Sequence, residues 1–439
     1  MSRSDTIFAL SSGAGRAGVA LIRVSGPHAG AALAALAGSK SFEPRKAKLA
    51  RLNDKNGEAI DDALVLWFAA PASFTGEDVA EFHVHGGRAI IEALLAALAA
   101  LPGLRPAEPG EFTRRAVENG KFDLTRAEAL ADLIDAETDS QRRQALRQYE
   151  GALAALYEGW RDRLIRAGAW AEAAIDFSDE EIPDDVIAGA RRTAGDILKE
   201  IQAHLNDSGR GEIVRNGVHL TVFGKTNAGK SSFVNALAKR DVAIVSPIPG
   251  TTRDVIEVHL DLGGYAVIVS DTAGLRPAEE AIESEGIRRA LARTESADIA
   301  LLLLDGTAVD PFAGLPEGAR ERASLAVWNK SDLPWPEHRD GLRISAKTGE
   351  GIDALVEALS KLIKQSLEGK GESPPLTRAR HRHALEQAAD ALSRAVAAQD
   401  TELMAEDLRL ALRALGRITG RVDIEELLDV IFRDFCIGK

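Results

Sequence analysis

A glycine-rich loop between a β-run and a helical run constrains this chain more than any other feature. The segment HLTVFGKTNAGKSSFVNAL has Gly224, four residues, and then Gly229, Lys230 and Ser231, which is the G-x-x-x-x-G-K-[ST] spacing in its required strand–loop–helix context. Glycines let the backbone wrap phosphates, so that N–H groups and the helix N-terminus face negative charge. Lys230 is expected to reach the β- and γ-phosphates and Ser231 to bind Mg²⁺. The segment therefore predicts a nucleotide-binding domain.

Three further short motifs follow in order at predicted strand ends. YAVIVSDTAG ends a strand at Asp271, which is suited to hold Mg²⁺, and Gly274 can offer its backbone N–H to the γ-phosphate. NKSD follows the next strand but one, and its Asp332 can accept hydrogen bonds from two N–H groups of guanine. Adenine presents the opposite donor pattern there. SAK, at Ser345 to Lys347, has the position of a base-contacting loop, and the four motifs together indicate a GTPase.

Leu275 follows DTAG at the position where Ras-like enzymes have a glutamine that orients the attacking water. Leucine cannot do this. The polar groups for hydrolysis must therefore come from elsewhere, and the candidates are the loop SPIPGTTRD, Arg276 and the acidic run EEAIESEG.

Composition limits the class of protein. The 439 residues give room for about three domains, and 45% hydrophobic with 28% charged residues is typical of globular proteins. A net charge of −13 is evidence against a protein that coats nucleic acid through its overall field. The single cysteine, Cys436, excludes a disulfide framework. No signal peptide is evident and no apolar run reaches the roughly 18 residues of a membrane span, so we expect a soluble cytoplasmic protein.

Three patterns of predicted secondary structure follow one another along the chain. Short strands mixed with Ala/Leu helices predict an α+β domain at the N-terminus, a helical pattern follows, and then strands alternate with helices as in a parallel sheet wrapped by helices. The last segment is helical again. We therefore predict a P-loop GTPase domain of α/β class inserted in a helical domain, with boundaries at 1–120, 121–213, 214–368 and 369–439.

Two local patterns are interpreted as structural. GAGRAG, from Gly13 to Gly18, has the dinucleotide-binding spacing but leads into the strand VALIRVS rather than a helix, so it predicts a strand–loop–strand turn and no NAD site. His83 and His85 lie on the same face of one predicted strand, which could suggest a metal site. No third ligand has a matching spacing, so the structural interpretation is favoured. The basic clusters RARHRH, from Arg378, and QRRQALR, from Gln141, are candidates for tRNA contact, although a solvated helix face is favoured for each.

Seven segments together resemble one known family over essentially the whole chain. They are GKTNAGKSS, AIVSPIPGTTRD, DTAGLR, NKSD, PGEFTRRAVENGKFDLTRAEAL, DTIFAL with GRAGVALIRVSG, and the C-terminal FCIGK. The family is that of the tRNA-modifying GTPase MnmE, also called TrmE. The resemblance implies an N-terminal folate-binding and dimerising domain, a central helical domain and an inserted G domain.

The resemblance also implies a GTPase that depends on potassium. The implied K⁺ ligands are Asn227, Ser246, Ile248 and Thr251. A cation fixed beside the phosphates stabilises the charge that develops in the transition state. Thr252 would join Ser231 on Mg²⁺, and Glu283, twelve residues after Asp271, would orient the attacking water. The sequence departs from the family at Lys225-Thr226, and it places Pro247 and Pro249 in the potassium loop.

The motifs and the resemblance together give two sets of expected residues in the G domain and the tail. The expected GTP-binding residues are Asn227, Ala228, Gly229, Lys230, Ser231, Ser232, Ser246, Thr251, Thr252, Asp271, Thr272, Ala273, Gly274, Asn329, Lys330, Asp332, Ser345, Ala346 and Lys347. The expected catalytic residues are Lys230, Arg276, Glu283 and Cys436.

By resemblance, a reduced folate, either 5-formyl- or methylene-tetrahydrofolate, binds the N-terminal domain. The implied contacts are Arg23, Glu81, Lys121 and Lys439. Arg23 can pair with the glutamate carboxylate of the ligand, and Glu81 can accept hydrogen bonds from the pterin. Cys436, in FCIGK, would then lie near the one-carbon donor or the target uridine. Whether its thiol is a nucleophile or only positions the tail stays open.

The resulting hypothesis is a homodimeric GTP hydrolase. With an FAD-containing partner, MnmG (GidA), it would form 5-aminomethyl-type or 5-carboxymethylaminomethyl-type uridine at the tRNA wobble position. The alternative is a regulatory GTPase in ribosome assembly, which shares every G-domain feature but predicts neither folate binding nor a function for the tail. A GTPase-coupled membrane transporter is disfavoured, because the sequence shows no apolar run of spanning length.

Overall fold

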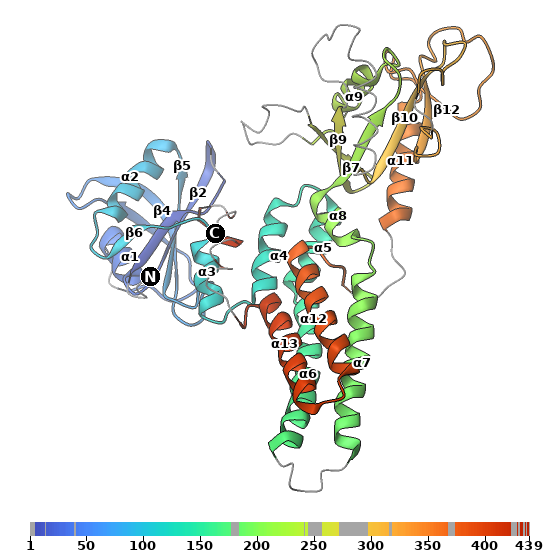
Figure 1. Ribbon diagram of the computed structural model, residues 1–439. Coiled ribbons are helices and arrows are strands. Elements are labelled where there is room, and N and C mark those ends of the chain that lie inside the picture. Colours follow the sequence, from blue (N-terminus) through green and yellow to red (C-terminus); the bar gives the residue numbers. More distant parts are fainter. Residues whose placement is uncertain are drawn as a thin grey trace. The chain divides into compact units, whose positions relative to one another are not determined.

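The computed structural model of the chain is shown in Figure 1. It describes residues 5–13, 15–38, 41–176, 184–240, 242–244, 257–271, 297–315, 318–367, 374–422, 428, 431–432, 435 and 437–438. The chain divides into two compact units. The first comprises Met1–Ala131, Gln148–Gly195 and Asp390–Lys439, and the second comprises Asp132–Arg147 and Asp196–Ala389.

The N-terminal part of the first unit is a six-stranded sheet in the order β3-β4-β5-β2-β1-β6. Its elements are β1 (Thr6–Leu10), β2 (Ala17–Ser25), β3 (Lys48–Asn53), β4 (Ala59–Phe68), β5 (Val79–Gly86) and β6 (Leu104–Pro106), with helices α1 (Ala29–Ala37) and α2 (Arg88–Ala99). Apolar residues alternate along the central strands, so that Ile22 and Phe82 face one side. There they form a core with Leu33 of α1 and Leu94 of α2.

The GAGRAG segment follows β1, and its last two residues begin β2. β1 and β2 are antiparallel, with Ala9 opposite Arg23. The structure therefore confirms the interpretation of this segment as a strand–loop–strand turn.

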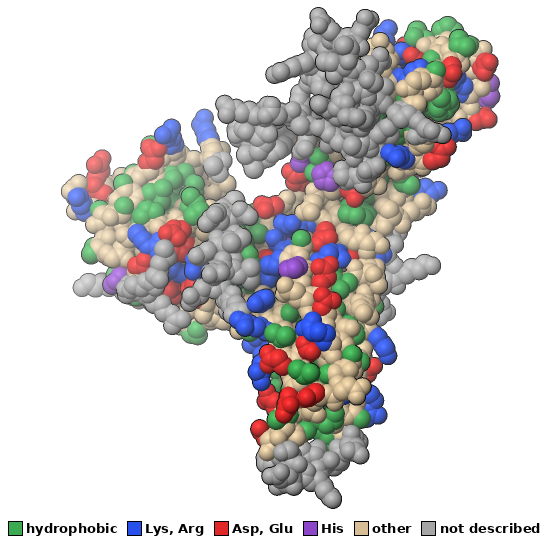
Figure 2. Space-filling view, in the orientation of Figure 1, with side chains coloured by type: hydrophobic (Ala, Val, Ile, Leu, Met, Phe, Trp, Pro, Cys, Tyr) green, Lys and Arg blue, Asp and Glu red, His purple; other side chains and the backbone are tan. Residues whose placement is uncertain are grey.

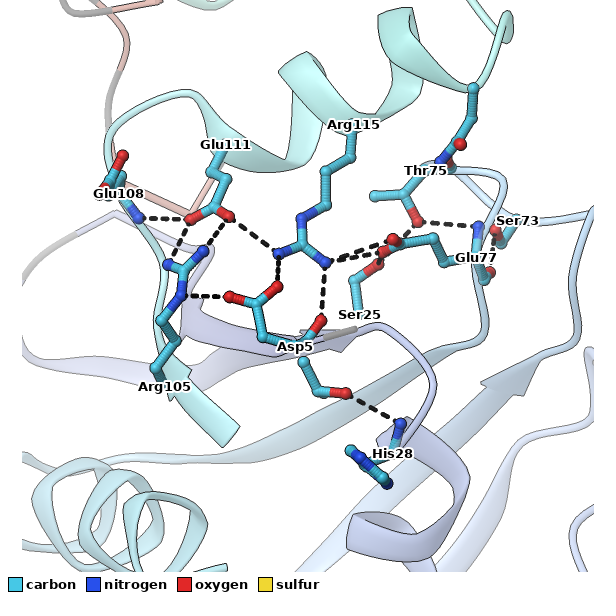
Figure 3. Close-up of polar contacts among 12 residues, drawn as sticks. Asp5, Ser25, His28, Ser73, Thr75, Glu77, Arg105, Glu108, Glu111 and Arg115 are labelled. Atoms are coloured by element: carbon cyan, nitrogen blue, oxygen red, sulfur yellow. Dashed lines mark hydrogen bonds and ion pairs between the residues drawn. The ribbon is translucent and has the colours of Figure 1, made fainter. Parts of the chain in front are cut away.

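Helix α3 (Glu111–Glu118) covers the other face of this sheet, where Phe112 packs on residues of β1. A network of ion pairs fixes the helix (Figure 3). Arg105 binds Asp5 and Glu111, both at 2.6 Å. Arg115, which is itself buried, binds the same two carboxylates at 2.9 Å each. These charges are paired on several sides, as charges removed from water must be.

The helical elements are α4 (Leu124–Asp135), α5 (Asp139–Tyr149), α6 (Ala152–Asp176), α7 (Asp184–Leu205), α12 (Ala379–Ala397) and α13 (Thr401–Thr419). In the first unit Arg409 of α13 pairs with Glu172 of α6 at 3.3 Å. Arg191 of α7 donates to the Val396 carbonyl at 2.8 Å. The last helices thus pack on helices that precede the α/β domain, which confirms that this domain is inserted in a helical one.

The α/β domain, in the second unit, has a six-stranded sheet in the order β12-β11-β10-β7-β9-β8. Its elements are α8 (Arg210–Asn216), β7 (Val218–Phe223), α9 (Lys230–Ala238), β8 (Glu257–Leu262), β9 (Tyr265–Asp271), β10 (Ile299–Asp305), β11 (Leu325–Asn329), β12 (Leu342–Arg343) and α11 (Ile352–Leu367). Neighbouring strands are parallel except β8 with β9. The predicted helix-wrapped parallel sheet is therefore confirmed.

The hydrophobic core of this domain fixes the position of the glycine-rich loop. Leu220 and Val222 of β7 pack with Leu301 of β10 and with Phe233 and Leu237 of α9. The loop is consequently held between a central strand and the helix that follows it. Within the part of the chain that the structure describes, we find no helix both apolar enough and long enough to cross a bilayer.

Candidate functional site: a nucleotide pocket and a tail-closed N-terminal site

The glycine-rich loop leaves β7 after Phe223 and enters α9 at Lys230. Gly224 and Gly229 have φ angles of 148° and 95°, which L side chains rarely adopt. A Cβ atom at Gly224 would overlap the Leu303 carbonyl, and one at Gly229 would overlap the side-chain amide of Asn329. Both glycines are therefore required by backbone conformation and by space.

Lys230 lies at the start of α9, where the unpaired N–H groups of the first turn favour an anion. Its Nζ donates to the carbonyls of Gly224 and Lys225, both at 2.9 Å. The ammonium group is thus held over the loop that a phosphate would occupy. Ser231 and Ser232 follow in the first turn of the same helix.

Asn227 has a left-handed backbone, with φ of 64°, and an exposed side chain. Asparagine tolerates this conformation better than most residues. The loop therefore presents an amide oxygen to solvent beside Lys230, and such an oxygen is a suitable ligand for an alkali cation. Ala228 is buried beneath it.

Asn329, the last residue of β11, joins three of the predicted motifs. Its Nδ2 donates to the Ala228 carbonyl at 2.8 Å, and its Oδ1 accepts from the backbone N–H of Ala346 at 2.9 Å. The side chain is only 2% exposed, so both bonds are shielded from water. One buried amide thereby ties the phosphate loop to both base-contacting segments.

Asp332 is exposed, and its carboxylate accepts from the Ser345 hydroxyl at 2.6 Å. This hydrogen bond, with the nearby charges of Lys347 and Lys330, lowers the pKa of Asp332 below its usual value. The group therefore stays ionised at neutral pH. An ionised carboxylate is an acceptor only, which suits a base edge that carries two donors.

Several expected residues lie outside the described part of the chain. They are Ser246, Ile248, Thr251, Thr252, Thr272, Ala273, Gly274, Arg276 and Glu283. Asp271 is described only by its backbone, at the end of β9 opposite Val222 of β7. That register places it level with the start of the glycine-rich loop.

In the N-terminal domain, Arg23 and Glu81 lie opposite each other on β2 and β5. Arg23 Nε and Nη2 donate to one oxygen of Glu81 at 3.0 and 2.9 Å. The guanidinium also stacks over the Phe74 ring, with 5.1 Å between its carbon and the ring centroid. Lys121 donates instead to the Pro71 carbonyl at 2.9 Å. Arg23 and Glu81 thus contact each other, whereas Lys121 has a different partner.

The C-terminal tail returns to this domain. Ile437 forms a β-bridge with Pro109, and the Gly438 carbonyl accepts from the Ser11 hydroxyl at 2.7 Å. Gly438 has φ of 97°, and a Cβ there would overlap the Leu10 carbonyl. The tail is therefore seated at the end of β1, the strand next to β2, which carries Arg23. Cys436 and Lys439 lie outside the described residues.

The two basic clusters bind carboxylates rather than standing free. Arg378 pairs with Asp132 at 2.7 Å, and Arg382 pairs with Asp207 at 2.8 Å. In the second cluster Arg142 pairs with Asp139 at 2.6 Å. On the face shown in Figure 2, acidic and basic side chains are interspersed along α12 and α13. These observations favour the interpretation of the clusters as ion-paired helix faces.

Sequence reasoning missed two aromatic side chains at these sites. Phe74 stacks on Arg23, and Trp335 donates to the Lys330 carbonyl within the NKSD segment at 2.9 Å. Both come from loops and contact residues that no local periodicity connects to them. A tryptophan three residues after the base motif was the one signal that the sequence offered.

A phosphate loop at the end of a central parallel strand, joined by one asparagine to two base-contacting loops, defines a P-loop domain of the GTPase class. Family models match both parts of the chain: "GTP-binding protein TrmE N-terminus" over residues 6–121 and "MnmE helical domain" over residues 124–436. The chain belongs to the MnmE family.

Curated relatives are similar over nearly their full length. The tRNA modification GTPase MnmE of Parvibaculum lavamentivorans is 58% identical, covering 99% of this chain and 100% of its own. That of Paramagnetospirillum magneticum is 56% identical with the same coverage. Among solved structures, the G domain of the T. maritima FeoB iron transporter is 22% identical, with a TM-score of 0.26, and covers 34% of this chain and 99% of its own.

Proposed function

We propose that this protein is a GTP hydrolase that acts in the modification of tRNA, in the cytoplasm. The observation that carries the proposal is the Asn329 amide, which joins the phosphate loop to the base-contacting loops. The geometry fits a guanine nucleotide, because Asp332 is ionised and exposed beside Ser345. Membership of a family whose members are named tRNA modification GTPases supplies the substrate class.

For hydrolysis, Lys230 binds the β- and γ-phosphates and Ser231 holds Mg²⁺ together with Thr252. The exposed amide oxygen of Asn227 fits a potassium ligand, alongside Ser246, Ile248 and Thr251. Bound there, K⁺ and Mg²⁺ supply positive charge against the charge that develops on the transferred phosphoryl group. Glu283 orients the attacking water in place of the glutamine that Leu275 displaces, and Arg276 adds a polar group nearby.

The N-terminal site fits a reduced folate. Glu81 offers a carboxylate for the donor-rich edge of a pterin, while Phe74 and Phe112 flank Arg23 and provide flat apolar surface. We assign 5-formyl- or methylene-tetrahydrofolate to this site, with Arg23, Lys121 and Lys439 on the ligand carboxylates. We also assign Cys436 to this site, in a nucleophilic or a positioning role.

The partners follow from the same family. An FAD-containing protein, MnmG (GidA), supplies the flavin, and the two proteins together form 5-aminomethyl- or 5-carboxymethylaminomethyl-uridine at the wobble position. We also propose a homodimer through the N-terminal domain. Leu49 of the edge strand β3 and Leu64 of β4 lie opposite each other and are 72% and 40% exposed, so they place two large aliphatic side chains side by side on the surface of the sheet.

A reconstituted reaction tests the proposal. The full chain, the flavoprotein partner, GTP, the reduced folate and unmodified tRNA are incubated with K⁺, and the nucleosides are then separated and weighed by mass spectrometry. We expect the modified uridine to appear only when GTP is present and hydrolysed. Hydrolysis without modification would leave the regulatory alternative, and failure to bind GTP would refute the nucleotide site.

A further inference from the structure

Trp335 lies in the loop that follows the base motif, and it contacts that motif directly. Its indole Nε1 donates to the Lys330 carbonyl at 2.9 Å. The guanidinium of Arg343 stacks on the indole at 5.0 Å, and the Trp328 ring lies 6.3 Å away, centroid to centroid. The indole is therefore held on several sides, while its one polar atom is aimed at the base motif.

Gly306 makes room for this indole. A Cβ atom on Gly306 would overlap three atoms of the Trp335 ring. The φ of Gly306 is not in the left-handed range, so an alanine could adopt the same backbone and the constraint is purely one of space. The Gly306 N–H also donates to the Asn329 carbonyl at 3.0 Å. One glycine thus contacts both the indole and the residue that begins the base motif.

The backbone of Lys330 has to be stabilised by contacts with neighbouring residues. Its φ is 68°, a left-handed conformation that is costly for a residue with a side chain. Asp305, at the end of β10, accepts from its Nζ at 2.6 Å, and the other Asp305 oxygen accepts from Thr307 Oγ1 at 2.7 Å. The strained residue is consequently fixed at its ammonium group by Asp305, and at its carbonyl by Trp335 together with the backbone N–H of Leu333 at 3.1 Å.

Asp332 is two residues beyond this fixed point. Its exposed carboxylate accepts from the Ser345 hydroxyl at 2.6 Å, and its position relative to a bound base also depends on the backbone that Lys330 begins. A hydrogen bond to a base requires a separation defined within a few tenths of an ångström. Small rotations at Lys330 would therefore move the carboxylate out of range.

We propose that Trp335, seated on Gly306, is a positioning residue for guanine recognition. It acts by holding the Lys330 carbonyl so that the Asp332 carboxylate meets both donors of the base. The inference rests on the proposed guanine-nucleotide site and names a residue that sets its specificity. A packing role alone would change stability without changing which base is chosen.

The test measures binding of GDP and of IDP, which lacks the 2-amino donor, by wild type, Trp335→Phe and Trp335→Ala. We expect Trp335→Ala to weaken GDP binding about tenfold and to lower the ratio of GDP to IDP affinity, because the lost precision affects the two-donor base more. Trp335→Phe, which keeps an aromatic ring but is smaller and lacks the N–H, should be intermediate. Val309→Ala, at an 87% exposed site in the neighbouring loop, is the matched control.

A second pair of variants separates positioning from general destabilisation. Gly306→Ala should reproduce the loss of selectivity, because its methyl group displaces the indole. In a Trp335→Ala background the same change should have no further effect. Unchanged selectivity in Trp335→Ala, or additive losses in the double variant, would overturn the inference. A wild type that fails to bind GDP would instead overturn the proposed function.

Discussion

The backbone N–H of Ser140 donates to the Gly264 carbonyl at 3.0 Å, which joins the first turn of α5 to the tip of the β8–β9 hairpin. Beside this bond, Glu137 lies 3.4 Å from His259 of β8. In the sequence this hairpin connects the segment with Thr252 to the segment after Asp271. A movement of either segment on GTP hydrolysis would therefore act on α5 through its first turn.

Ser140→Pro should uncouple tRNA modification from GTP hydrolysis. Proline removes the N–H that Gly264 accepts but is tolerated in the first turn of a helix, where that N–H has no intrahelical partner. We expect near-normal GTP hydrolysis and a GTP-dependent tRNA modification rate that falls at least about fivefold, since coupling free energies are typically 1–3 kcal/mol. Ser140→Ala retains the N–H and should behave like wild type in both assays. If GTP hydrolysis and tRNA modification stay equally coupled in both variants, the hydrogen bond between Ser140 and Gly264 is dispensable.

Gly229→Ala should lose nucleotide affinity. The new methyl group would be held in a left-handed backbone and would push against the Asn329 amide. Such strain costs about 1–3 kcal/mol, which is roughly 5- to 150-fold in Kd for GDP by fluorescent-nucleotide titration. Gly168→Ala is the control, because Gly168 is in the middle of α6 and an added Cβ there would have no atom within 4 Å. It should leave the affinity for GDP intact. Normal GDP binding by Gly229→Ala would argue that this loop does not enclose the phosphates.

Replacing K⁺ by Na⁺ at constant ionic strength should slow GTP hydrolysis roughly tenfold or more, because the smaller ion does not fit the same ligands and less charge opposes the transition state. Glu283→Ala should slow turnover to a similar degree while leaving GTP affinity unchanged. Phosphate release measures the rate of GTP hydrolysis, and equilibrium titration measures the affinity for GTP. Equal rates in both salts would remove the potassium site from the mechanism.

Arg23→Ala should weaken binding of 5-formyl-tetrahydrofolate by about 2 kcal/mol, roughly thirtyfold, in calorimetric titration of the full chain. The reason is the loss of a charged donor and of the partner that fixes Glu81. Arg51→Ala is the matched control, because Arg51 forms a comparable but exposed pair with Asp62 on the same sheet. If both variants bind folate equally, the ligand lies elsewhere.

The ion-pair network of α3 should make the N-terminal domain sensitive to acid. Burial alone would raise the pKa of Asp5 and of Glu111, but the hydrogen bonds and charges of Arg105 and Arg115 outweigh it and lower both pKa values below their ordinary values. The folded carboxylates thus bind protons less readily than unfolded ones. Their contribution to stability is complete above about pH 5 and is lost as the pH falls through the folded values.

Glu111→Gln tests this dependence. It should cost about 3 kcal/mol at pH 7, because Arg105 and Arg115 lose a buried counter-ion. The difference in thermal midpoint from wild type should narrow toward pH 3.5. Glu92→Gln, in an exposed pair with Arg88, should show little effect at either pH. A pH-independent difference would indicate that the charge of Glu111 does not matter.

The sequence predicted those parts of the fold that local pattern determines. The β-run before Gly224 and the helix from Lys230 follow from periodicity and glycine placement, and the turn at GAGRAG followed from the strand after it. The carboxylate partners of Arg378 and Arg382 were not predictable, because Asp132 and Asp207 are distant in the sequence. The contact of Trp335 with Gly306 was missed for the same reason.

Asp132 accepts from Arg215 Nε at 2.8 Å and from Arg378 Nη2 at 2.7 Å. Arg215 lies in α8, at the start of the inserted domain, and Arg378 follows that domain in the chain. A deletion from α8 to α11 would remove Arg215, so that Asp132, a carboxylate only 12% exposed, would keep Arg378 alone of these two counter-ions. A chain without the insertion would therefore lose part of the positive charge that balances the Asp132 carboxylate.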